Sequence, residues 1–262
     1  MCGRYVLVQK IETIEKRFNV KSTEGLEWKP SYNISIGQLA PVITSDHPQH
    51  LDLMRFGLTP FWSKKQMYLF NARSEGDRNM NNDPNYSGSK NIINKPAFRK
   101  LIRSQRCLVL ADAFIEGSND EGLKKPFLVY LQNKERPFAM AGVFDEWKDM
   151  ERGETLRSFS IITTTSNSLM QQFPHSRMPV ILEKSQEQRW LNMHTPLSEI
   201  TKMLRPFNAD LMNAYPISPD IKSPKSNGKQ LITPIGERLN PEFNLRSSGK
   251  IHLQGMGRYK LD

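Results

Sequence analysis

Alternating apolar and polar positions along the chain predict many short β-strands separated by turns. The candidate strands are rich in β-branched and aromatic residues and fall at residues 5–8, 41–44, 51–56, 67–72, 107–115, 127–131, 138–144, 158–164 and 179–182. Two polar segments, residues 132–137 and 150–154, have the composition of hairpin connections, so the strands that flank each are expected to pair antiparallel. Many strands with few helices favour an α+β fold over an alternating βαβ enzyme.

Helical periodicity is confined to a few short segments. Three apolar residues share one face of a first predicted helix, namely Ile11, Ile14 and Phe18. A second, short helix is expected around residues 101–102. Ser185 followed three residues later by Gln188 resembles a capping box that opens another helix. A last helix begins near Ser198 and should end before Pro206.

Two polar stretches fall outside this pattern. Residues 77–96 carry six Asn together with Gly, Ser and Pro, which predicts a long exposed loop. From Asp220 onward the chain has eight Lys/Arg against four Asp/Glu. We expect residues 219–262 to form a polar, basic segment that packs on the domain or trails from it. The rest is predicted to be a single α+β domain with a curved, mostly antiparallel sheet or partial β-barrel and peripheral helices.

Composition narrows the function classes. The chain has 262 residues and a formal net charge of +10, which raises the expectation of a polyanionic partner because Lys and Arg neutralise phosphates. No apolar run is long enough to span a membrane, and the first residues lack the pattern of a secretory signal. With only two Cys, a disulfide framework is not expected, and a reducing, cytoplasmic compartment follows. His47 and His50 flank Pro48 in a loop, and neither a metal site nor a cofactor is expected.

Cys2 is the position with the most distinctive chemistry. Removal of Met1 would leave a residue that bears an α-amine, with a pKa of about 7.7–8.0, and a thiol, with a pKa of about 8.5. The neutral amine can condense with an aldehyde to a Schiff base, and the thiolate can then close onto the same carbon as a thiazolidine ring. An aldehyde would be the natural target of such a group.

Seven motifs in order resemble those of the SRAP family, the SOS response-associated peptidases or abasic-site processing proteins. They are Met1-Cys2-Gly3-Arg4-Tyr5, Tyr32-Asn33-Ile34, Phe56-Gly57-Leu58-Thr59-Pro60-Phe61-Trp62, Asn71-Ala72-Arg73-Ser74-Glu75, Arg106-Cys107-Leu108 with Ala111-Asp112-Ala113-Phe114-Ile115-Glu116, Ala141-Gly142-Val143-Phe144, and His175-Ser176-Arg177-Met178-Pro179-Val180. The resemblance spans roughly residues 2–218. It implies the SRAP fold and covalent trapping of the ring-opened aldehyde of an abasic site in single-stranded DNA.

The resemblance also implies roles for particular residues. Cys2 would be the nucleophile and attachment point, Asn71 would orient the N-terminal residue and the lesion, Glu116 would handle protons, and His175 would assist aldehyde formation or Schiff-base chemistry. An abasic sugar is mostly a closed hemiacetal, so a positioned acid or base must move a proton before a free aldehyde forms. The proposed contacts with DNA are Arg4, Arg73 and Arg177 as phosphate clamps and Trp62 as an aromatic wedge.

The chain departs from the family pattern at three places. Ile36 stands where the family usually has Pro, Gly117 stands where it has Trp, and residues 217–222 replace a Val-Ser…Val-Asn element. These changes leave the proposed reactive groups in place and put base stacking and part of the DNA groove in doubt.

Two other functions stay open. The chain could be a non-covalent single-stranded nucleic-acid-binding protein, or a peptidase that processes its own N-terminus. A covalent DNA-damage enzyme could also show weak lyase and adduct-reversal activity, and a monomer located in a bacterial cytoplasm, on the nucleoid when bound to DNA, is expected.

Overall fold

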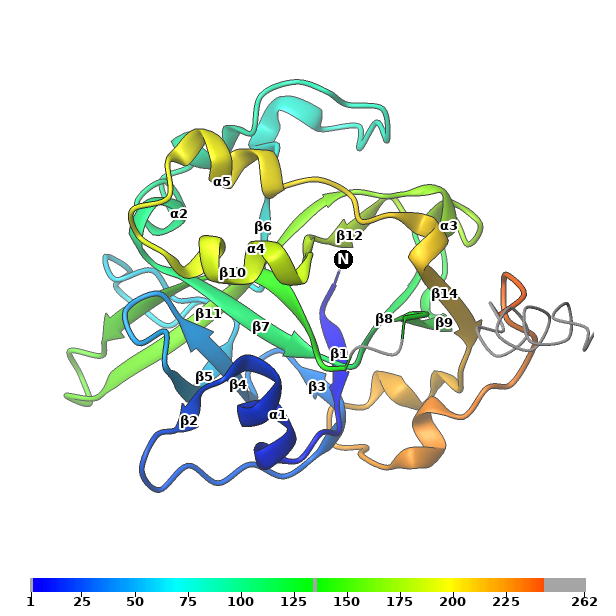
Figure 1. Cartoon of the computed structure of the whole chain (residues 1–262), viewed down its shortest axis with the longest axis horizontal. Helices are drawn as coiled ribbons and strands as arrows, with labels where there is room; N and C mark the ends of the chain where they lie inside the picture. The colour runs from blue at the N-terminus through cyan, green and yellow to red at the C-terminus, as the bar shows by residue number, and fades with distance from the viewer. Residues whose placement is uncertain (1, 134–135, 243–262) are drawn as a thin grey trace, which may run out of the picture.

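The first of two sheets contains the N-terminal strand at an interior position. A computed structural model describes residues 2–133 and 136–242 (Figure 1). Within these residues the strand order is β14-β9-β8-β1-β3, with every neighbouring pair antiparallel. The strands are β1 (Arg4–Leu7), β3 (Ser31–Ser35), β8 (Ala113–Ser118), β9 (Gly122–Leu131) and β14 (Met212–Pro216). Because β1 lies between β3 and β8, its backbone is fixed from both sides.

The second sheet curls into a partial barrel. Its order is β12-β11-β10-β7-β4-β5-β2, and β11 pairs with β5 as well, which curves the sheet round on itself. The strands are β2 (Lys21–Ser22), β4 (Leu39–Thr44), β5 (His50–Phe56), β6 (Asn71–Arg73), β7 (Arg106–Ala111), β10 (Phe138–Lys148), β11 (Thr155–Thr165), β12 (Arg177–Pro179) and β13 (Ile181–Leu182). Most pairs are antiparallel, and the pairs β11–β5, β11–β6 and β2–β5 are parallel. The expected α+β class with a mostly antiparallel, partly closed sheet is confirmed.

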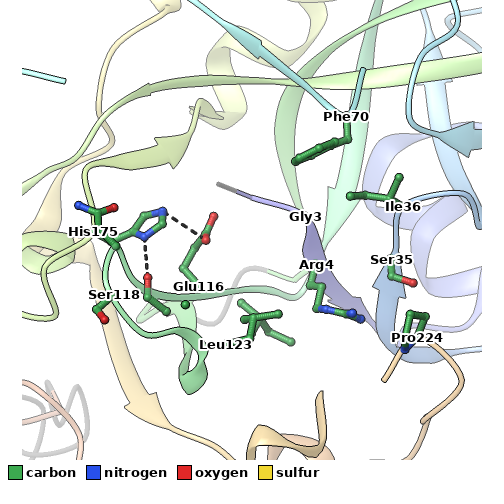
Figure 2. Close-up of a pocket in the computed structure, with 14 residues that line it drawn as sticks. Gly3, Arg4, Ser35, Ile36, Phe70, Glu116, Ser118, Leu123, His175 and Pro224 are labelled. Carbon is green, nitrogen blue, oxygen red and sulfur yellow. Dashed lines mark hydrogen bonds and ion pairs between the residues drawn. The ribbon is translucent and has the colours of Figure 1, made fainter. Parts of the chain in front are cut away.

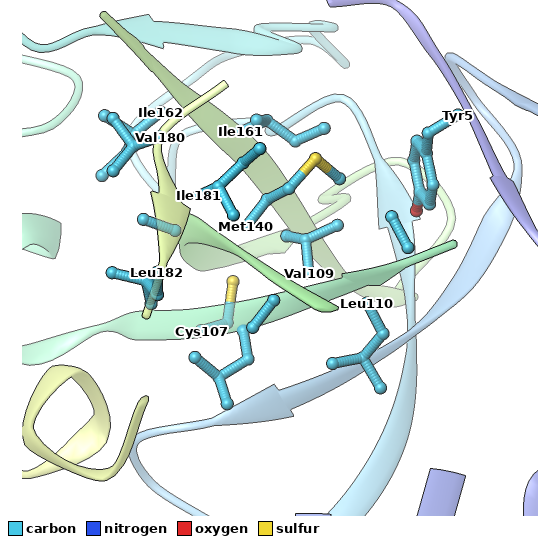
Figure 3. Packing of buried hydrophobic residues seen from close by; sticks show 14 of the residues in the cluster. Tyr5, Cys107, Val109, Leu110, Met140, Ile161, Ile162, Val180, Ile181 and Leu182 are labelled. Carbon is cyan, nitrogen blue, oxygen red and sulfur yellow. The ribbon is translucent and has the colours of Figure 1, made fainter. Parts of the chain in front are cut away.

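A continuous apolar core fills the interior of this curved sheet. Figure 3 shows part of it, where Cys107 and Val109 of β7 pack near Met140 of β10. Both sides of β7 are buried, because its whole length runs through the core. Such strands read in the sequence as continuous apolar runs, which explains why this element was recognisable.

Short helices lie at the periphery of the sheets (Figure 1). They are α1 (Ile11–Phe18), α2 (Leu101–Ser104), α3 (Ser168–Gln171), α4 (Lys184–Leu191) and α5 (Leu197–Met203). Helices were predicted at all of these places except α3. The expected capping box at Ser185 and Gln188 is wrong, because Glu183 is the N-cap and exchanges hydrogen bonds with Gln186. A capping box does open this helix, but it lies two residues earlier in the chain than predicted.

The predicted strand at residues 107–115 is broken at Asp112. The chain leaves the second sheet after β7 and enters the first sheet as β8. Asp112 stabilises the crossing: its backbone N–H donates to the Val6 carbonyl at 2.7 Å, and its carboxylate accepts from Val8 N at 2.7 Å and from Gln9 Nε2 at 3.2 Å. A buried carboxylate bound to β1 therefore joins the two sheets next to the N-terminal strand.

Of the two expected hairpins, one is confirmed and one is wrong. The segment at residues 150–154 does join the antiparallel strands β10 and β11. Residues 132–137 connect different sheets, because Leu131 of β9 pairs with Met212 whereas Phe138 of β10 pairs with Ala111. Residues 134–135 lie outside the described part of the chain.

Several other segments differ in extent from the prediction. The strand expected at residues 67–72 is reduced to β6, preceded by a single bridge between Leu58 and Leu69. The expected loop at residues 77–96 contains two 3-10 helices, η1 (Gly76–Asn79, beginning one residue earlier) and η2 (Asn91–Asn94). Strands β2, β3 and β14 and the 3-10 helix η3 (Ala209–Leu211) were not predicted.

After β14 the chain packs along the first sheet. It forms η4 (Pro219–Lys222) and η5 (Lys229–Ile232), and it buries Ile221 and Leu231 in a second apolar cluster on that sheet. Residues 243–262 of the expected basic segment lie outside the described chain. In the described ranges no helix has the length and apolar character needed to cross a membrane.

We expect Asp112→Ala to destabilise the protein, because it leaves the N–H of Val8 without its carboxylate acceptor at a buried crossing. An unsatisfied buried donor costs about 1–3 kcal/mol of the free energy of unfolding. Urea unfolding followed by circular dichroism measures the change, and Asp120→Ala, in an exposed turn, is the control. Equal stability of the two variants would contradict the role given to Asp112.

Candidate active site and nucleic-acid interface

The β1–β8 register positions the N-terminal residues beside an acidic side chain. Tyr5 is opposite Phe114 and Val6 is opposite Ala113, so continuing the antiparallel ladder brings Gly3 opposite Glu116. Cys2 lies two residues before the first residue of β1 and is 1% exposed. The same pairing that buries the apolar residues of β1 therefore brings Cys2 close to a carboxylate.

Glu116 and His175 form a buried pair in direct contact. His175 Nε2 lies 3.2 Å from Glu116 Oε2, and its Nδ1 lies 2.6 Å from the carbonyl oxygen of Gly117 (Figure 2). A carbonyl only accepts, so Nδ1 carries a hydrogen. The contact between Nε2 and the carboxyl group is then attractive only with a proton between them. The pair can give or take that proton as a unit.

The surroundings shift the titration of both His175 and Cys2. Burial lowers the pKa of His175, and the nearby Glu116 carboxylate opposes this shift. Burial also raises the pKa of the Cys2 thiol, and the charge of Glu116 raises it further, whereas Arg177 acts in the opposite direction. The thiol is accordingly uncharged at neutral pH and has a proton acceptor beside it.

Asn71 fixes the backbone of Cys2. At the start of β6, its Nδ2 donates to the Cys2 carbonyl at 3.1 Å and to the Phe70 carbonyl at 3.0 Å. Its Oδ1 is buried and has no hydrogen-bond partner among the described residues. The parallel pairing of β6 with β11 aligns Asn71 with Ile161, which keeps the amide in place. This acceptor is available to an N–H or O–H group brought in next to Cys2.

An open cleft of about 460 Å³ is bordered by the Glu116–His175 pair. Glu116 and His175 lie on one side, and Arg4, Ser35 and Pro224 lie on the other (Figure 2). Its remaining lining includes Gly3, Ile36, Phe70, Ile115, Gly117, Ser118, Asn119, Gly122 and Leu123. The cleft is therefore apolar in part, with one proton-exchanging pair and one guanidinium at its sides.

Arg177 occupies a different environment from the one expected of a phosphate clamp. It is 3% exposed, and its Nη2 lies 2.8 Å from Glu75 Oε2 and 3.2 Å from Thr163 Oγ1. Burial alone raises the pKa of Glu75, but the charge and hydrogen bond of Arg177 outweigh it and hold the pKa below its usual range. Arg177 is thus engaged inside the protein by a fully buried carboxylate.

Arg73 and Arg177 both reach the segment that follows β6. The Asn82 Oδ1 accepts from Arg73 Nη2 at 3.0 Å and from Arg177 Nη1 at 3.3 Å, and Arg73 also donates to the Asn79 carbonyl. Arg73 remains half-buried. The two guanidinium groups therefore attach this segment to the edge of the site.

Trp62 is 52% exposed and lies outside the cleft, next to Phe61, which is 55% exposed. The ammonium group of Lys100 lies 5.1 Å from the centre of the Phe61 ring. Two exposed aromatic rings with a cation above one of them form a surface that can stack on bases.

The departure at Gly117 has a local cause. A Cβ at this position would lie 1.8 Å from the Gly122 carbonyl oxygen, because the β8–β9 pairing shifts register at this point. A side chain there, including the family's Trp, would require the hairpin to open. Gly117 thus permits a close backbone approach at the edge of the cleft.

The structure brings together Cys2, Asn71, Glu116 and His175. Glu116, His175 and Arg4 line the cleft, whereas Cys2 and Asn71 adjoin its lining residues Gly3 and Phe70. Sequence analysis missed Glu75, Asn33 and Phe70 as parts of the surroundings. Glu75 closes one of the quoted motifs, but its sequence context does not reveal a buried partner. Within the described ranges no group of three His, Cys, Asp or Glu side chains could hold a metal ion.

Comparison with known proteins defines the family. The model of the SOS response associated peptidase (SRAP) family matches residues 1–224. The chain belongs to this family. It is 35% identical over 240 residues to the abasic site processing protein YoqW of Bacillus subtilis, covering 88% of this chain and 99% of the relative. It is 28% identical to the abasic site processing protein HMCES of Gallus gallus, covering 97% of this chain and 83% of the relative.

A solved structure has a similar fold. The chain superposes on the crystal structure of a protein from Bacteroides thetaiotaomicron with a TM-score of 0.75 and 27% identity, covering 90% of this chain and 100% of the other. The likeness therefore extends over most of the fold described above.

The Glu75–Arg177 pair predicts a particular dependence of stability on pH. Because the folded-state pKa of Glu75 is lowered, its contribution is fully present above the ordinary glutamate pKa of about 4.3 and is lost as pH falls through the folded value. Glu75→Gln leaves Arg177 buried without a counter-charge, so we expect a loss of about 3–5 kcal/mol at neutral pH. The stability of the variant should also decline less in acid.

Urea unfolding of both proteins from neutral pH to about pH 3 tests this expectation. Glu146→Gln, which neutralises an exposed glutamate on β10, is the control. Parallel curves of stability against pH for the wild type and Glu75→Gln would show that Glu75 does not titrate as inferred.

Proposed function

We propose that this SRAP protein senses abasic sites in single-stranded DNA and forms a covalent thiazolidine crosslink through Cys2 after removal of Met1. The observation that carries the proposal is the position of Cys2: it is buried next to Gly3, which lines the cleft, with its carbonyl held by Asn71 and the Glu116–His175 pair beside it. Relatives named abasic site processing proteins support the same substrate.

The proposed reaction has two bond-forming steps after the sugar opens. The Glu116–His175 pair moves the proton that converts the closed hemiacetal into an aldehyde. The α-amine of Cys2 adds to the aldehyde carbon, and loss of water leaves a carbon–nitrogen double bond. The sulfur then bonds to that carbon, the π electrons move to nitrogen, and nitrogen gains the proton that sulfur gives up. Water is the only group released.

Each neighbouring residue has a part in this scheme. Asn71 holds Cys2 and offers its buried Oδ1 to the amine or to a sugar hydroxyl. Arg4 and Arg73, both half-buried, contribute positive charge along the path of the backbone. Arg177 is buried and holds Asn82, in the segment that Arg73 also contacts. Its positive charge also acts to lower the pKa of the Cys2 thiol. Trp62 stacks on a neighbouring base.

Side reactions follow from the same intermediate. A Schiff base that does not close to a ring can promote β-elimination and nick the strand, so weak lyase activity accompanies crosslinking. Reversal of the adduct and removal of Met1 by the protein itself are compatible with the family's peptidase name. We further propose that the protein acts as a monomer.

Cys2→Ala should abolish the heat-stable adduct with a single-stranded oligonucleotide that a uracil glycosylase has rendered abasic. The variant keeps an α-amine once Met1 is removed, so borohydride should still trap an open imine as a reduced amine. Denaturing gels, peptide mapping and intact-mass measurement of Met1 provide the readouts. Cys107→Ala, at a thiol buried in the core, is the matched control and should crosslink normally.

Two results would overturn this assignment. One is an attachment point other than residue 2, and the other is efficient crosslinking by protein that retains Met1. Adduct-free binding of abasic and intact strands with equal affinity would instead favour the non-covalent nucleic-acid-binding function.

Glu116→Gln and His175→Gln should each slow crosslink formation by about 10² to 10⁴, the usual contribution of a positioned acid or base. The final yield should approach that of the wild type, because Cys2 is retained. Single-turnover time courses measure the rate, with Glu121→Gln, in the adjacent hairpin, as the control. Wild-type rates in both variants would remove the pair from the reaction.

A further inference from the structure

The segment after β14 forms a strap against the first sheet. We define the C-terminal strap as residues 219–232, from η4 to η5, which lies next to β9 and β3 (Figure 1, orange). Ile221 and Leu231 are buried near its two ends, in the cluster that includes Val6 and Ile115. The exposed part between these two anchors is therefore held at both ends by apolar packing.

Asn33 of β3 fixes the middle of the strap. It is 1% exposed, and its Nδ2 lies 2.9–3.2 Å from three strap carbonyl oxygens, those of Ile221, Ser223 and Ser226. The backbone N–H of Tyr32 donates to Asn227 Oδ1 at 2.8 Å. An amide buried among the carbonyls of a loop sets that loop's path, because each carbonyl would otherwise need another donor.

The same cluster connects the strap to the candidate active site. Arg4, two residues from Cys2, donates through Nη1 to Asn33 Oδ1 at 2.8 Å and through Nη2 to the Lys222 carbonyl. Pro224 lines the cleft opposite the Glu116–His175 pair (Figure 2). The strap therefore forms one side of the cleft.

The exposed part of the strap is basic. Lys222, Lys225 and Lys229 are exposed, and the sequence has no Asp or Glu from residue 221 to residue 236. Lys222 and Lys225 border a hollow of about 520 Å³ together with Ser223, Ser226 and Asn227. Asp220 also borders this hollow, and its Oδ2 accepts from the Ser218 hydroxyl at 2.9 Å. Ammonium and hydroxyl groups in a shallow hollow suit a phosphate oxygen.

We propose that the C-terminal strap is a contact surface for the single-stranded DNA backbone, along which the strand leaves the cleft past Pro224. This inference rests on the proposed function, since it takes the strand to be the one whose lesion reaches Cys2. Asn33 is a positioning residue in this scheme: it holds Lys222 and Lys225, which flank the cleft-lining Pro224 in the chain, without touching DNA. Arg4 links that position to β1.

The double variant Lys222→Ala/Lys225→Ala tests the surface. Affinity for an undamaged single-stranded oligonucleotide is measured by fluorescence anisotropy at several salt concentrations. Each lost phosphate contact should lower the slope of log affinity against log salt by about 0.7, so a decrease of about 1.4 is expected. The control, Lys16→Ala/Lys202→Ala, makes the same charge change on exposed positions of α1 and α5 and should leave the slope unchanged.

Asn33→Ala tests the positioning role separately. It should reduce the slope in the same direction while the lysines are retained, and hydrogen exchange of residues 222–230 should become faster. A double lysine variant with the wild-type slope would overturn the strap proposal even where Cys2 still crosslinks abasic DNA. The opposite combination is a reduced salt slope in the double lysine variant together with no adduct formed by the wild type. This result would support the strap as a binding surface and refute the proposed covalent function.

Discussion

The hydrogen-bonded position of β1 between β3 and β8 is the constraint on which the site depends. A terminal strand at a sheet edge would fray, but β1 has partners on both sides and is also held by Asp112 at its far end. Cys2 therefore has a defined position relative to Glu116, set by the register of Tyr5 and Phe114. Precise placement of reacting groups is worth far more than their mere presence, because a small displacement costs much of the rate. The sheet supplies that placement through main-chain pairing.

Glu75 and Glu116 are both buried, but their different ion-pair partners give the two carboxylates different roles. Glu75 is fully buried and satisfied by Arg177 and Thr164, an arrangement that holds structure together and resists protonation. Glu116 instead faces an imidazole, a group that can hold or release a proton, and it borders an open cleft. A carboxylate paired with a guanidinium stays charged, since Arg does not release its proton. A carboxylate paired with histidine can exchange one, which is the property that the proposed ring opening and ring closure require.

Much of the fold could be predicted because its strands are buried on one or both faces and so carry strong hydrophobic patterns, as β7 and β10 do. The sequence pattern did not reveal the break at Asp112. The carboxylate of Asp112 accepts hydrogen bonds from Val8 and Gln9, and contacts between residues so far apart in the chain leave no mark on the local hydrophobic pattern. The candidate site residues were predicted from motif resemblance together with the aminothiol chemistry of Cys2. Glu75 and Asn33 were missed because their importance lies in partners more than 100 residues away, which local periodicity does not encode.

Burial of Cys2 has a consequence for the order of the proposed steps. A thiol whose pKa is raised by burial and by a neighbouring carboxylate is a poor nucleophile at rest, because the thiolate is the reactive form. Reaction of sulfur before nitrogen would require an isolated buried thiolate beside Glu116. Once the amine has formed an imine, however, the electrophilic sugar carbon is bonded to the nitrogen of Cys2 itself. The sulfur of the same residue can then close a five-membered ring, and the nitrogen takes up the proton that the sulfur loses. Amine attack first, followed by ring closure, is therefore the order that avoids an uncompensated negative charge in the buried site.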